Sequence, residues 1–332
     1  MKPISVVQIG LGPLGRKIAK FLAERPVFRI VGAVDTDPSL AGKTLGDLAE
    51  VKRLAVPVRA SLKEALTGGK PDAVILTTVS DMARIVPQLE AILEFNLPVV
   101  STCEELSFPW KTSPDLAARV DAAARRAGVA VLGTGVNPGY LMDTLPVCLT
   151  AVCQKVEAVR VSRIQDASVR RIPFQRKIGA GMSLDAFEAK RRTGTLRHVG
   201  LTESMHLIAA RMGWTLDRTE DVLTPVVTKT RIVTEAMTIE AGQAAGVQQI
   251  GRGFAGGVER ITLTFRAAIG EPHPEDAVEI AGTPPIRSVI PGGVNGDIAT
   301  CAITLNAIPR ILEATPGLKT MIDVPIVSWF GE

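Results

Sequence analysis

The chain has 332 residues, of which 46% are hydrophobic and 22% are charged, and its formal net charge is +4. A chain of this length is too long to fold around one ordinary hydrophobic core, which favours two domains. The small net charge, with Lys and Arg scattered among acids, argues against nucleic acid as a partner. No apolar run approaches the roughly 20 residues that span a bilayer, and no signal-peptide pattern is present, so we expect a cytoplasmic protein without a membrane partner.

The cysteine pattern argues against a zinc site and against a disulfide framework. None of the four cysteines has C-x-x-C spacing or a histidine nearby, and such sites would be expected to show one or the other. We therefore expect no metal. The densest basic stretch runs from Arg170 to Arg192 and also contains Asp185 and Glu188. We interpret it as a solvated or oligomer-facing segment.

The first predicted elements form a βαβ unit with a glycine-rich turn. A strand over Ile4–Ile9 leads into a G-x-G-x-x-G turn and then a helix over Arg16–Glu24, and Asp35 ends the next strand, 20 positions past the last glycine. This order is typical of a dinucleotide site, although a glycine-rich loop of another α/β protein remains the alternative. The residues predicted to bind the cofactor here are Gly10, Gly12, Pro13, Leu14, Gly15, Asp35 and Thr36.

The chemistry of these residues suggests how the cofactor would bind. The glycines let the turn close and let a pyrophosphate approach the helix N-terminus, where free N–H groups favour anions. Asp35 would accept hydrogen bonds from the adenosine ribose, and its charge favours NAD over NADP because it would repel a 2′-phosphate. Lys43 or Arg59 could also reach the adenosine end, so use of both cofactors stays open.

Strands and helices continue to alternate up to residue 139. We predict strands over 73–78, 98–101 and 129–132 and helices over 87–95 and 114–127. The strands are continuously apolar, as in a doubly wound parallel sheet covered on both faces. Such sheets bind ligands at the carboxyl ends of their strands. Three further residues near these ends are predicted to contact the cofactor: Thr78, Ser80 and Asn137.

The pattern changes after residue 155. Apolar and polar residues alternate over 156–164, 226–232 and 258–269, which predicts a mainly antiparallel sheet with one exposed face. Helices are predicted over 201–212 and from 294 through 312. We therefore expect a Rossmann domain over 1–139, an α+β substrate and dimerisation domain over 140–294, and a segment over 295–332 that packs back on the first domain.

Some dehydrogenase mechanisms can be tested against the residues present. The only tyrosine, Tyr140, is followed four positions later by Thr144, so a Tyr-x-x-x-Lys pair is excluded. The three histidines lack zinc-ligand spacing. They are His198, His206 and His273, all in the second predicted domain. A His-and-Arg mechanism of the 2-hydroxy acid dehydrogenase type therefore stays open.

Two adjacent carboxylates, Glu104 and Glu105, follow the predicted strand over 98–101. A carboxylate beside a nicotinamide could hold an ammonium ion, accept its proton and stabilise an iminium cation. Enclosure at that place would raise its pKa towards a useful range. The alternative is that Glu104 or Glu105 caps a helix or faces solvent, and position alone does not separate these interpretations.

Five segments together resemble the 2,4-diaminopentanoate dehydrogenase and native amine dehydrogenase group, whose members are often labelled dihydrodipicolinate reductase-like. The segments are Gly10–Gly15, Ser101–Leu106, Gly133–Tyr140, Asp166–Arg171 and Arg197–Ser204. The resemblance implies NAD(P)-dependent oxidative deamination of an amine, or the reductive amination of a carbonyl compound with ammonia, and a homodimer. In this family the glutamate after the cysteine of the S-T-C-E-E-L motif is catalytic. That role carries over to Glu104, with Glu105 in support.

The substrate pocket is less well defined by the sequence. Arg163 and His198 could grip the carboxylate of an amino acid such as 2,4-diaminopentanoate, or form a surface salt bridge and a hydrogen bond at a dimer contact. Tyr140 could line the pocket or belong to the core, and Asn137 could bind a carboxamide or cap a helix. Glu105, Phe174 and Met182 are the remaining pocket candidates.

Three functions therefore remain to be compared. The first is an amine dehydrogenase, including 2,4-diaminopentanoate dehydrogenase itself. The second is an imine or carbonyl reductase that does not use ammonia, such as a dihydrodipicolinate reductase-like enzyme. The His-His pair and the Lys-x-Asp-x-Pro-Ser-Gly-Thr segment of true dihydrodipicolinate reductases are absent, which disfavours the lysine-pathway reaction. The third is a non-catalytic dinucleotide sensor, which would have no need of Glu104.

Overall fold

The computed structural model describes residues 2–170 and 172–331, and the chain divides into two compact units. Unit 1 comprises Met1–Tyr140 and Asn295–Glu332, and unit 2 comprises Leu141–Val294. Arg171, which belongs to one of the family-like segments, lies outside the described residues. Within the described part of the chain, no helix combines the length and the apolar character needed to cross a membrane.

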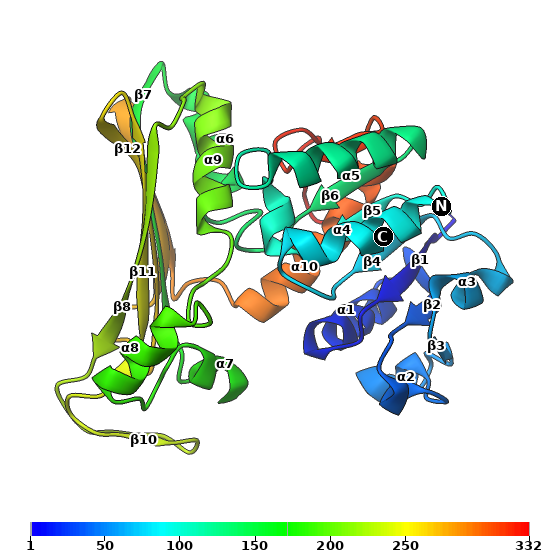
Figure 1. Ribbon diagram of the computed structural model, residues 1–332, viewed down its shortest axis with the longest axis horizontal. Helices are drawn as coiled ribbons and strands as arrows, with labels where there is room; N and C mark the ends of the chain where they lie inside the picture. Colours follow the sequence, from blue (N-terminus) through cyan, green and yellow to red (C-terminus); the bar gives the residue numbers. More distant parts are fainter. Residues whose placement is uncertain (1, 171, 332) are drawn as a thin grey trace. The chain divides into compact units, whose positions relative to one another are not determined.

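Unit 1 is built on a seven-stranded parallel sheet with the order β15-β6-β5-β4-β1-β2-β3 (Figure 1). The strands are β1 (Ile4–Ile9), β2 (Phe28–Val34), β3 (Val58–Arg59), β4 (Ala73–Leu76), β5 (Val99–Ser101), β6 (Ala130–Gly133) and β15 (Gly317–Lys319). This doubly wound order reverses between β1 and β4, where such sheets bind their ligands. The predicted Rossmann class is confirmed.

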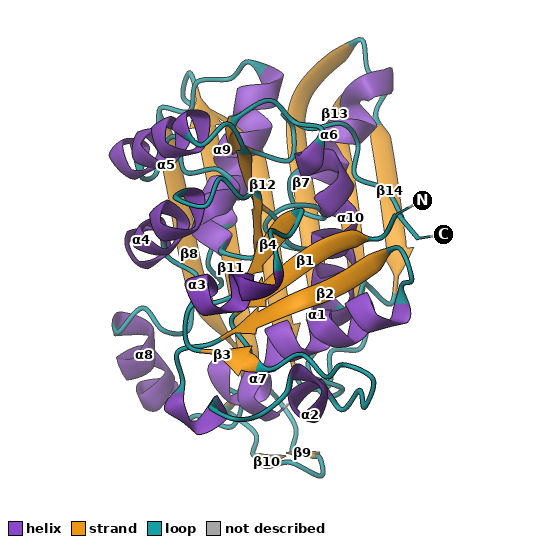
Figure 2. Ribbon diagram, turned by 90° about the vertical axis from the view of Figure 1, so that its right-hand side faces the viewer, coloured by secondary structure: helices purple, strands orange, loops and turns teal. Residues whose placement is uncertain are grey.

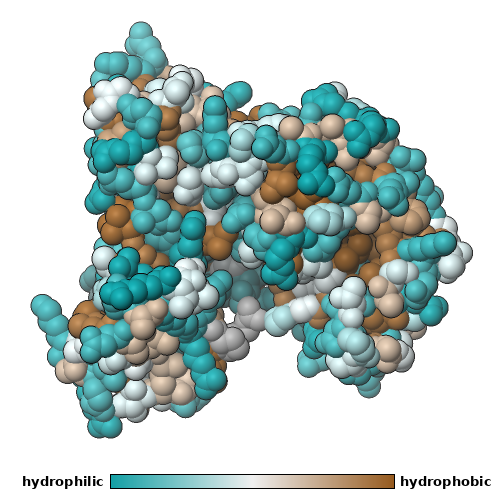
Figure 3. Space-filling view, in the orientation of Figure 1, coloured by the Kyte–Doolittle hydropathy of each residue, from teal (hydrophilic) through white to brown (hydrophobic). Residues whose placement is uncertain are grey.

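Helices cover both faces of this sheet (Figure 2). The long helices are α1 (Pro13–Glu24), α4 (Met82–Leu93), α5 (Pro114–Arg126) and α10 (Gly296–Leu312), and the short ones are α2 (Leu45–Ala49), α3 (Leu62–Ala65), η1 (Pro38–Leu40) and η2 (Leu66–Gly68). Ile18 of α1 and Leu305 of α10 share one core cluster with Ile75. Leu89 of α4 packs on the other face with Leu76. The helix α5 also packs there and presents a hydrophilic outer surface (Figure 3).

The helix predicted to begin at Pro87 begins five residues earlier, at Met82. Asp81 caps it by accepting a hydrogen bond from the Arg84 N–H over 2.9 Å. Pro87 lies inside the helix and removes one backbone donor. Burial of Ile85 and its apolar neighbours on the same face offsets that loss. The proline was therefore wrongly interpreted as the helix start.

Unit 2 contains a six-stranded mixed sheet with the order β14-β13-β7-β12-β11-β8, in which only β7 and β12 pair in parallel. The strands are β7 (Lys155–Asp166), β8 (Arg218–Val227), β11 (Ala244–Ala255), β12 (Val258–Ala268), β13 (Glu275–Thr283) and β14 (Ile286–Pro291), with a small ribbon of β9 (Ile232–Val233) and β10 (Thr238–Ile239). The helices are α6 (Thr144–Leu149), η4 (Thr150–Val152), α7 (Ile172–Lys177), α8 (Leu184–Arg192) and α9 (Leu201–Met212). The predicted α+β class with a mainly antiparallel sheet is confirmed.

The strand predicted over 226–232 is wrong. The strand β8 ends at Val227, and β9 begins at Ile232. Between them the Thr228 hydroxyl donates to the Thr230 carbonyl oxygen over 2.7 Å and accepts from the Thr230 N–H over 3.3 Å. Such local side-chain bonds compete with a strand ladder and turn the chain.

The two faces of the unit 2 sheet differ in character. On one face α9 packs closely, since a Cβ on Gly251 would lie 3.1 Å from Leu201 and 3.2 Å from Met205. On the other face, one row of aligned residues crosses all six strands without a charge. This central row consists of Val289, Ala277, Ser162, Thr264, Ile250 and Val222. Charged residues such as Arg160 and Arg266 occupy the neighbouring rows.

Candidate active site

The glycine-rich turn follows β1 and depends on two of its three glycines for closure. Gly10 has φ +87°, and a Cβ there would lie 2.5 Å from the Thr77 carbonyl oxygen. A Cβ on Gly15 would lie 1.9 Å from the Gly10 carbonyl oxygen. Gly12 differs, because a Cβ there would meet nothing within 4 Å and the residue is exposed. Open space at Gly12 leaves room for a ligand to approach the backbone.

The N-terminus of α1 is suited to a diphosphate. Gly12 occupies the cap position without a side-chain cap, and Pro13 is the first helical residue. The first-turn N–H groups of this helix therefore receive no hydrogen bond from a capping side chain, and the helix dipole adds partial positive charge. Leu14 packs against the core cluster below and anchors the turn. These residues fit a dinucleotide cofactor of the kind that the sequence predicts.

Asp35 ties the end of β2 to the glycine-rich turn. Its Oδ2 accepts a hydrogen bond from the Leu11 N–H over 2.6 Å, and its Oδ1 accepts from the Asp37 N–H over 2.9 Å. Hydrogen bonds from Ser39 lower the pKa of Asp37 below its usual range, so a second negative charge stands two residues further on. Thr36, between them, is exposed. Contact of Asp35 with a ribose stays a prediction.

Gln8 and Thr77, which were not predicted as site residues, hold the glycine-rich turn by hydrogen bonds. The Thr77 hydroxyl donates to the Gly10 carbonyl oxygen over 2.9 Å. The Gln8 amide nitrogen donates to Thr77 Oγ1 over 2.8 Å and to the Gly10 carbonyl oxygen over 3.1 Å. Gln8 is fully buried, and a glutamine inside an apolar strand was the available signal. By contrast, the predicted Thr78 is exposed and donates to Gln88 Oε1 over 2.7 Å.

The turn that carries Glu104 is held by three neighbouring strands. This 3-10 turn, η3 (Glu104–Ser107), follows β5. The Ser101 hydroxyl at the end of β5 donates to the Leu76 carbonyl oxygen of β4 over 3.1 Å and accepts from the Cys103 N–H over 3.2 Å. On the β6 side, a Cβ on Gly133 would lie 2.6 Å from the Leu106 backbone. Half-buried Glu104 therefore lies at the same carboxyl edge of the sheet as the glycine-rich turn.

Glu105, the second of the two adjacent carboxylates, bonds to the segment that follows β4 and to the start of α4. Glu105 Oε2 accepts a hydrogen bond over 2.8 Å from the N–H of Met82, the first residue of α4. Glu105 therefore caps a helix, which is the alternative role considered for either glutamate. Its own N–H donates to the Ser80 carbonyl oxygen over 3.1 Å. Beside them, burial and then the nearby acidic charges raise the pKa of the Cys103 thiol. That thiol is therefore protonated at neutral pH.

The loop after β6 extends the same edge. The Thr134 N–H donates to the Ser101 carbonyl oxygen over 2.9 Å, and the Val136 N–H donates to Thr300 Oγ1 of α10 over 3.4 Å. Asn137, 9% exposed, lies within this loop. Tyr140, one of the predicted pocket residues, packs against the core cluster that contains Ile18 and Leu305.

Arg163 lies inside unit 2. Its side chain is 3% exposed, its Nη2 donates to the Val294 carbonyl oxygen over 3.0 Å, and its Nε lies 3.8 Å from Asp276 Oδ1. Asp276 Oδ2 accepts from the Val294 N–H over 2.7 Å. Burial raises the pKa of Asp276, against the opposing effect of Arg163. The salt bridge named as the alternative for Arg163 is therefore present, but it is buried.

His198 lies near Arg163 on the α9-covered face. Its ring stacks on Phe265, with ring centroids 4.6 Å apart, and Phe265 is the register partner of Arg163. The Gln249 side chain accepts from the His198 N–H over 2.6 Å and donates to its carbonyl oxygen over 3.1 Å. The structure thus places the His198 ring against Phe265, next to Arg163 in the same row of the unit 2 sheet.

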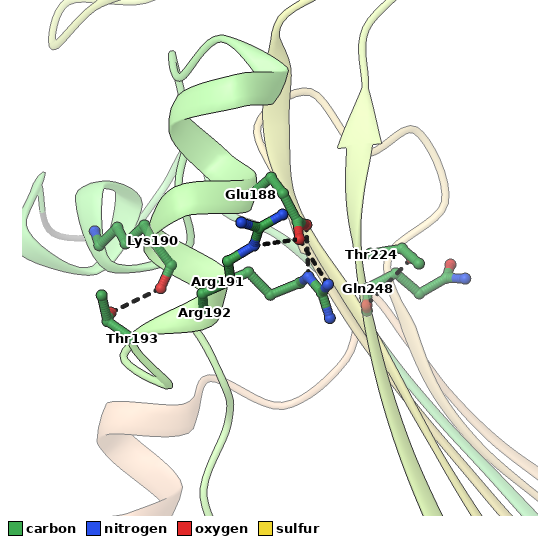
Figure 4. Close-up of polar contacts among 7 residues, drawn as sticks. All are labelled: Glu188, Lys190, Arg191, Arg192, Thr193, Thr224 and Gln248. Carbon is green, nitrogen blue, oxygen red and sulfur yellow. Dashed lines mark hydrogen bonds and ion pairs between the residues drawn. The ribbon is translucent and has the colours of Figure 1, made fainter.

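The two remaining pocket candidates, Phe174 and Met182, lie within the basic stretch. The Arg170 guanidinium lies 4.3 Å from the centre of the Phe174 ring, and the Met182 carbonyl oxygen accepts from the Ala244 N–H over 2.9 Å. In α8, hydrogen bonds from Arg191 and Arg192 lower the pKa of half-buried Glu188 to about 2 (Figure 4). Ion pairs of this kind are compatible with the interpretation of the stretch from Arg170 to Arg192 as a solvated or oligomer-facing segment, which stays a prediction.

Comparisons with known proteins agree with the motifs. A family model described as the 2,4-diaminopentanoate dehydrogenase C-terminal domain matches residues 140–331. The chain is 32% identical to a 2,4-diaminopentanoate dehydrogenase of Acetoanaerobium sticklandii, over 98% of this chain and 94% of the relative. It is 23% identical to an amine dehydrogenase of Streptomyces virginiae, over 99% and 98% of the two chains. A solved amine dehydrogenase structure from Mycobacterium smegmatis is 24% identical and superposes with a TM-score of 0.84, covering 98% of this chain and 97% of that one.

Proposed function

The chain belongs to the 2,4-diaminopentanoate dehydrogenase family, and from this premise we propose that it is an NAD(P)-dependent amine dehydrogenase. In the proposed reaction a protonated amine, water and NAD(P)⁺ give a carbonyl compound, ammonium, NAD(P)H and a proton. The reverse reaction is reductive amination. One observation carries the proposal: a dinucleotide-type glycine turn and a carboxylate-bearing turn lie at the carboxyl edge of one parallel sheet.

The cofactor, when bound, supplies hydride transfer to and from the carbon that bears nitrogen. The residues proposed to hold it in unit 1 are Gly10, Gly12, Pro13, Leu14, Gly15, Asp35, Thr36, Thr78, Ser80 and Asn137. The open backbone at Gly12 would accept the diphosphate at the α1 N-terminus. The acidic pair Asp35 and Asp37 favours NAD, because a 2′-phosphate would meet two negative charges.

Glu104 is proposed as the catalytic carboxylate. In amination it would hold ammonium by charge and hydrogen bonding and accept a proton as the nitrogen attacks the carbonyl carbon. Passing this proton to the hydroxyl of the resulting carbinolamine would release water and return Glu104 to its charged form, whose negative charge would stabilise the iminium cation that the hydride reduces. Its position on η3 supports this role, since β4, β5 and β6 together fix the turn. Unit 2 would supply the substrate-binding residues.

The face of the unit 2 sheet that carries the central row is proposed to form a homodimer interface. Its central row, from Val289 to Val222, is uncharged, while Val222 is 46% exposed. The flanking row contains both Arg160 and Glu279. A second copy related by a two-fold axis would bring the same row against itself, and unlike charges of the two copies could meet at its sides.

An ammonium-dependence assay tests the proposed activity. Purified protein would be mixed with NADH or NADPH, a panel of aldehydes and ketones, and either ammonium chloride or sodium chloride. In the oxidative direction, 2,4-diaminopentanoate would be tested with simpler amines. We expect cofactor oxidation only with ammonium. Oxidation that ignores ammonium would instead support an imine or carbonyl reductase.

The Glu104→Gln variant tests the proposed catalytic residue. Loss of a proton-transfer group costs about 10² to 10⁴ in rate, so we expect kcat for amination to fall at least about 100-fold while NADH still binds, as measured by fluorescence titration. Glu94→Gln, which alters an exposed glutamate of the same unit, is the control and should keep full activity. An active Glu104→Gln enzyme would exclude Glu104 as the catalytic carboxylate.

A further inference from the structure

Glu105 connects two segments of unit 1 that lie 23 residues apart in sequence. Its N–H donates to the Ser80 carbonyl oxygen over 3.1 Å, and its Oε2 accepts from the Met82 N–H over 2.8 Å. Both its backbone and its side chain therefore bind the segment between β4 and α4. That segment contains Thr78 and Ser80, two of the residues proposed to contact the cofactor.

The bond to Met82 is of a strong type. The first four N–H groups of a helix have no partner within the helix, and a carboxylate at this end also interacts favourably with the helix dipole. Glu105 serves the N–H of Met82, and Asp81 serves that of Arg84 over 2.9 Å. Two carboxylates from different segments thus share one helix N-terminus, but only Glu105 belongs to η3.

This bond also fixes how η3 is rotated. Successive residues of a 3-10 turn are about 120° apart around its axis, so a Glu105 side chain held at α4 sets the direction in which the Glu104 side chain leaves the turn. The backbone of η3 is confined on its other sides by Gly133 of β6 and by Ser101 of β5. Towards α4, the Glu105 side chain adds its bond to Met82 to the backbone bond between the Glu105 N–H and the Ser80 carbonyl oxygen.

We propose that Glu105 is a positioning residue that locks the turn carrying Glu104 to the cofactor-side segment between β4 and α4. This inference rests on the proposed function of Glu104. The carboxylate next in sequence to the catalytic one would then take no part in the chemistry. It would hold the Glu104 carboxylate in a fixed position relative to the site of hydride transfer, because the bond between Glu105 and Met82 joins η3 to the cofactor-side segment.

Three variants test this role in the full-length protein. Glu105→Ala removes the acceptor, and because a displacement of about 1 Å can cost about 10² in rate, we expect kcat for amination to fall at least about tenfold with a smaller change in the KM for the carbonyl substrate. Glu105→Gln keeps an oxygen that can accept from Met82, so we expect kcat within about threefold of wild type. Rescue by this conservative variant separates hydrogen bonding from charge.

Asp81→Ala is the matched control. It removes a hydrogen bond from the same helix N-terminus without touching η3. We expect it to lower Tm about as much as Glu105→Ala does, since each variant loses one capping bond, but to keep kcat. Equal losses of Tm with full kcat in both variants would overturn the positioning role, as would a Glu105→Gln enzyme no more active than Glu105→Ala.

The wild-type measurement separates this inference from the function on which it rests. A wild-type chain without ammonium-dependent activity would overturn the proposed function and the positioning role together. An active wild type combined with a fully active Glu105→Ala variant would overturn the positioning role alone. The expected result is an active wild type, an active Glu105→Gln variant and an impaired Glu105→Ala variant.

Discussion

Arg163 shows how burial decides the role of a charged side chain. The sequence predicts it as a candidate to grip a substrate carboxylate, because arginine forms strong paired bonds to carboxylates. In the structure the carboxylate beside it is that of Asp276, and Val294 accepts a further bond. Both charged side chains are at most 5% exposed. Removing one partner of such a pair leaves the other buried without compensation.

Replacing Arg163 by methionine should therefore lower the stability of the fold rather than change which substrates bind. We expect Arg163→Met to lower the free energy of unfolding by about 3 to 5 kcal/mol, the usual cost of breaking a buried ion pair, and Arg163→Met with Asp276→Asn to recover part of that loss. Urea unfolding measures both. The variant should change KM equally for carboxylated and uncharged substrates. A KM rise confined to carboxylated substrates would restore Arg163 as a substrate-binding residue.

At the scale of elements, the C-terminal strand β15 is fastened to the first sheet by a side chain of α5. Asp121 accepts from the Leu318 N–H over 2.9 Å and from Arg125 over 2.7 Å. Burial alone would raise the pKa of Asp121, but these hydrogen bonds outweigh it and hold the pKa below the usual value. The stability contributed by this carboxylate is therefore present above the unfolded pKa of about 3.9 and lost as the pH falls through the lower folded value.

The pH dependence of Tm tests this fastening. We expect Asp121→Asn to unfold at a lower temperature than wild type at pH 7. The difference in Tm should shrink as the pH falls below about 4, because the wild-type carboxylate then becomes protonated and loses its charge. Glu313→Gln, which removes an exposed ion pair with Arg310, should change Tm little at any pH. A difference between Asp121→Asn and wild type that stays constant down to pH 2 would contradict the assignment.

At the scale of the molecule, the sequence predicted the class of each sheet better than its details. The parallel sheet was readable because its strands are continuously apolar and its glycine turn has a strict steric pattern. Strands β11 and β13 were not predicted, since glycines and small residues interrupt their alternation. The bonds of Thr77 and Glu105 join residues distant in sequence, and spacing along the chain does not reveal such contacts.

The proposed homodimer can be tested at the centre of the uncharged row. Thr264 pairs with Ser162 on the two central strands, β12 and β7, so Thr264→Arg would bring two like charges together near the two-fold axis. We expect wild type to sediment as a dimer and Thr264→Arg as a monomer with unchanged far-UV circular dichroism. Ala241→Arg, in an exposed turn, is the control and should remain dimeric. A Thr264→Arg dimer would place the interface elsewhere.

The most direct test of the amine dehydrogenase assignment follows two atoms into the product. The enzyme would receive a ketone, ¹⁵N-ammonium and NADH carrying deuterium at the transferred position, and the product would be analysed by mass spectrometry and NMR. We expect an amine in which ¹⁵N and deuterium are bonded to the same carbon, and no such product from Glu104→Gln. A deuterated alcohol without ¹⁵N would contradict the assignment.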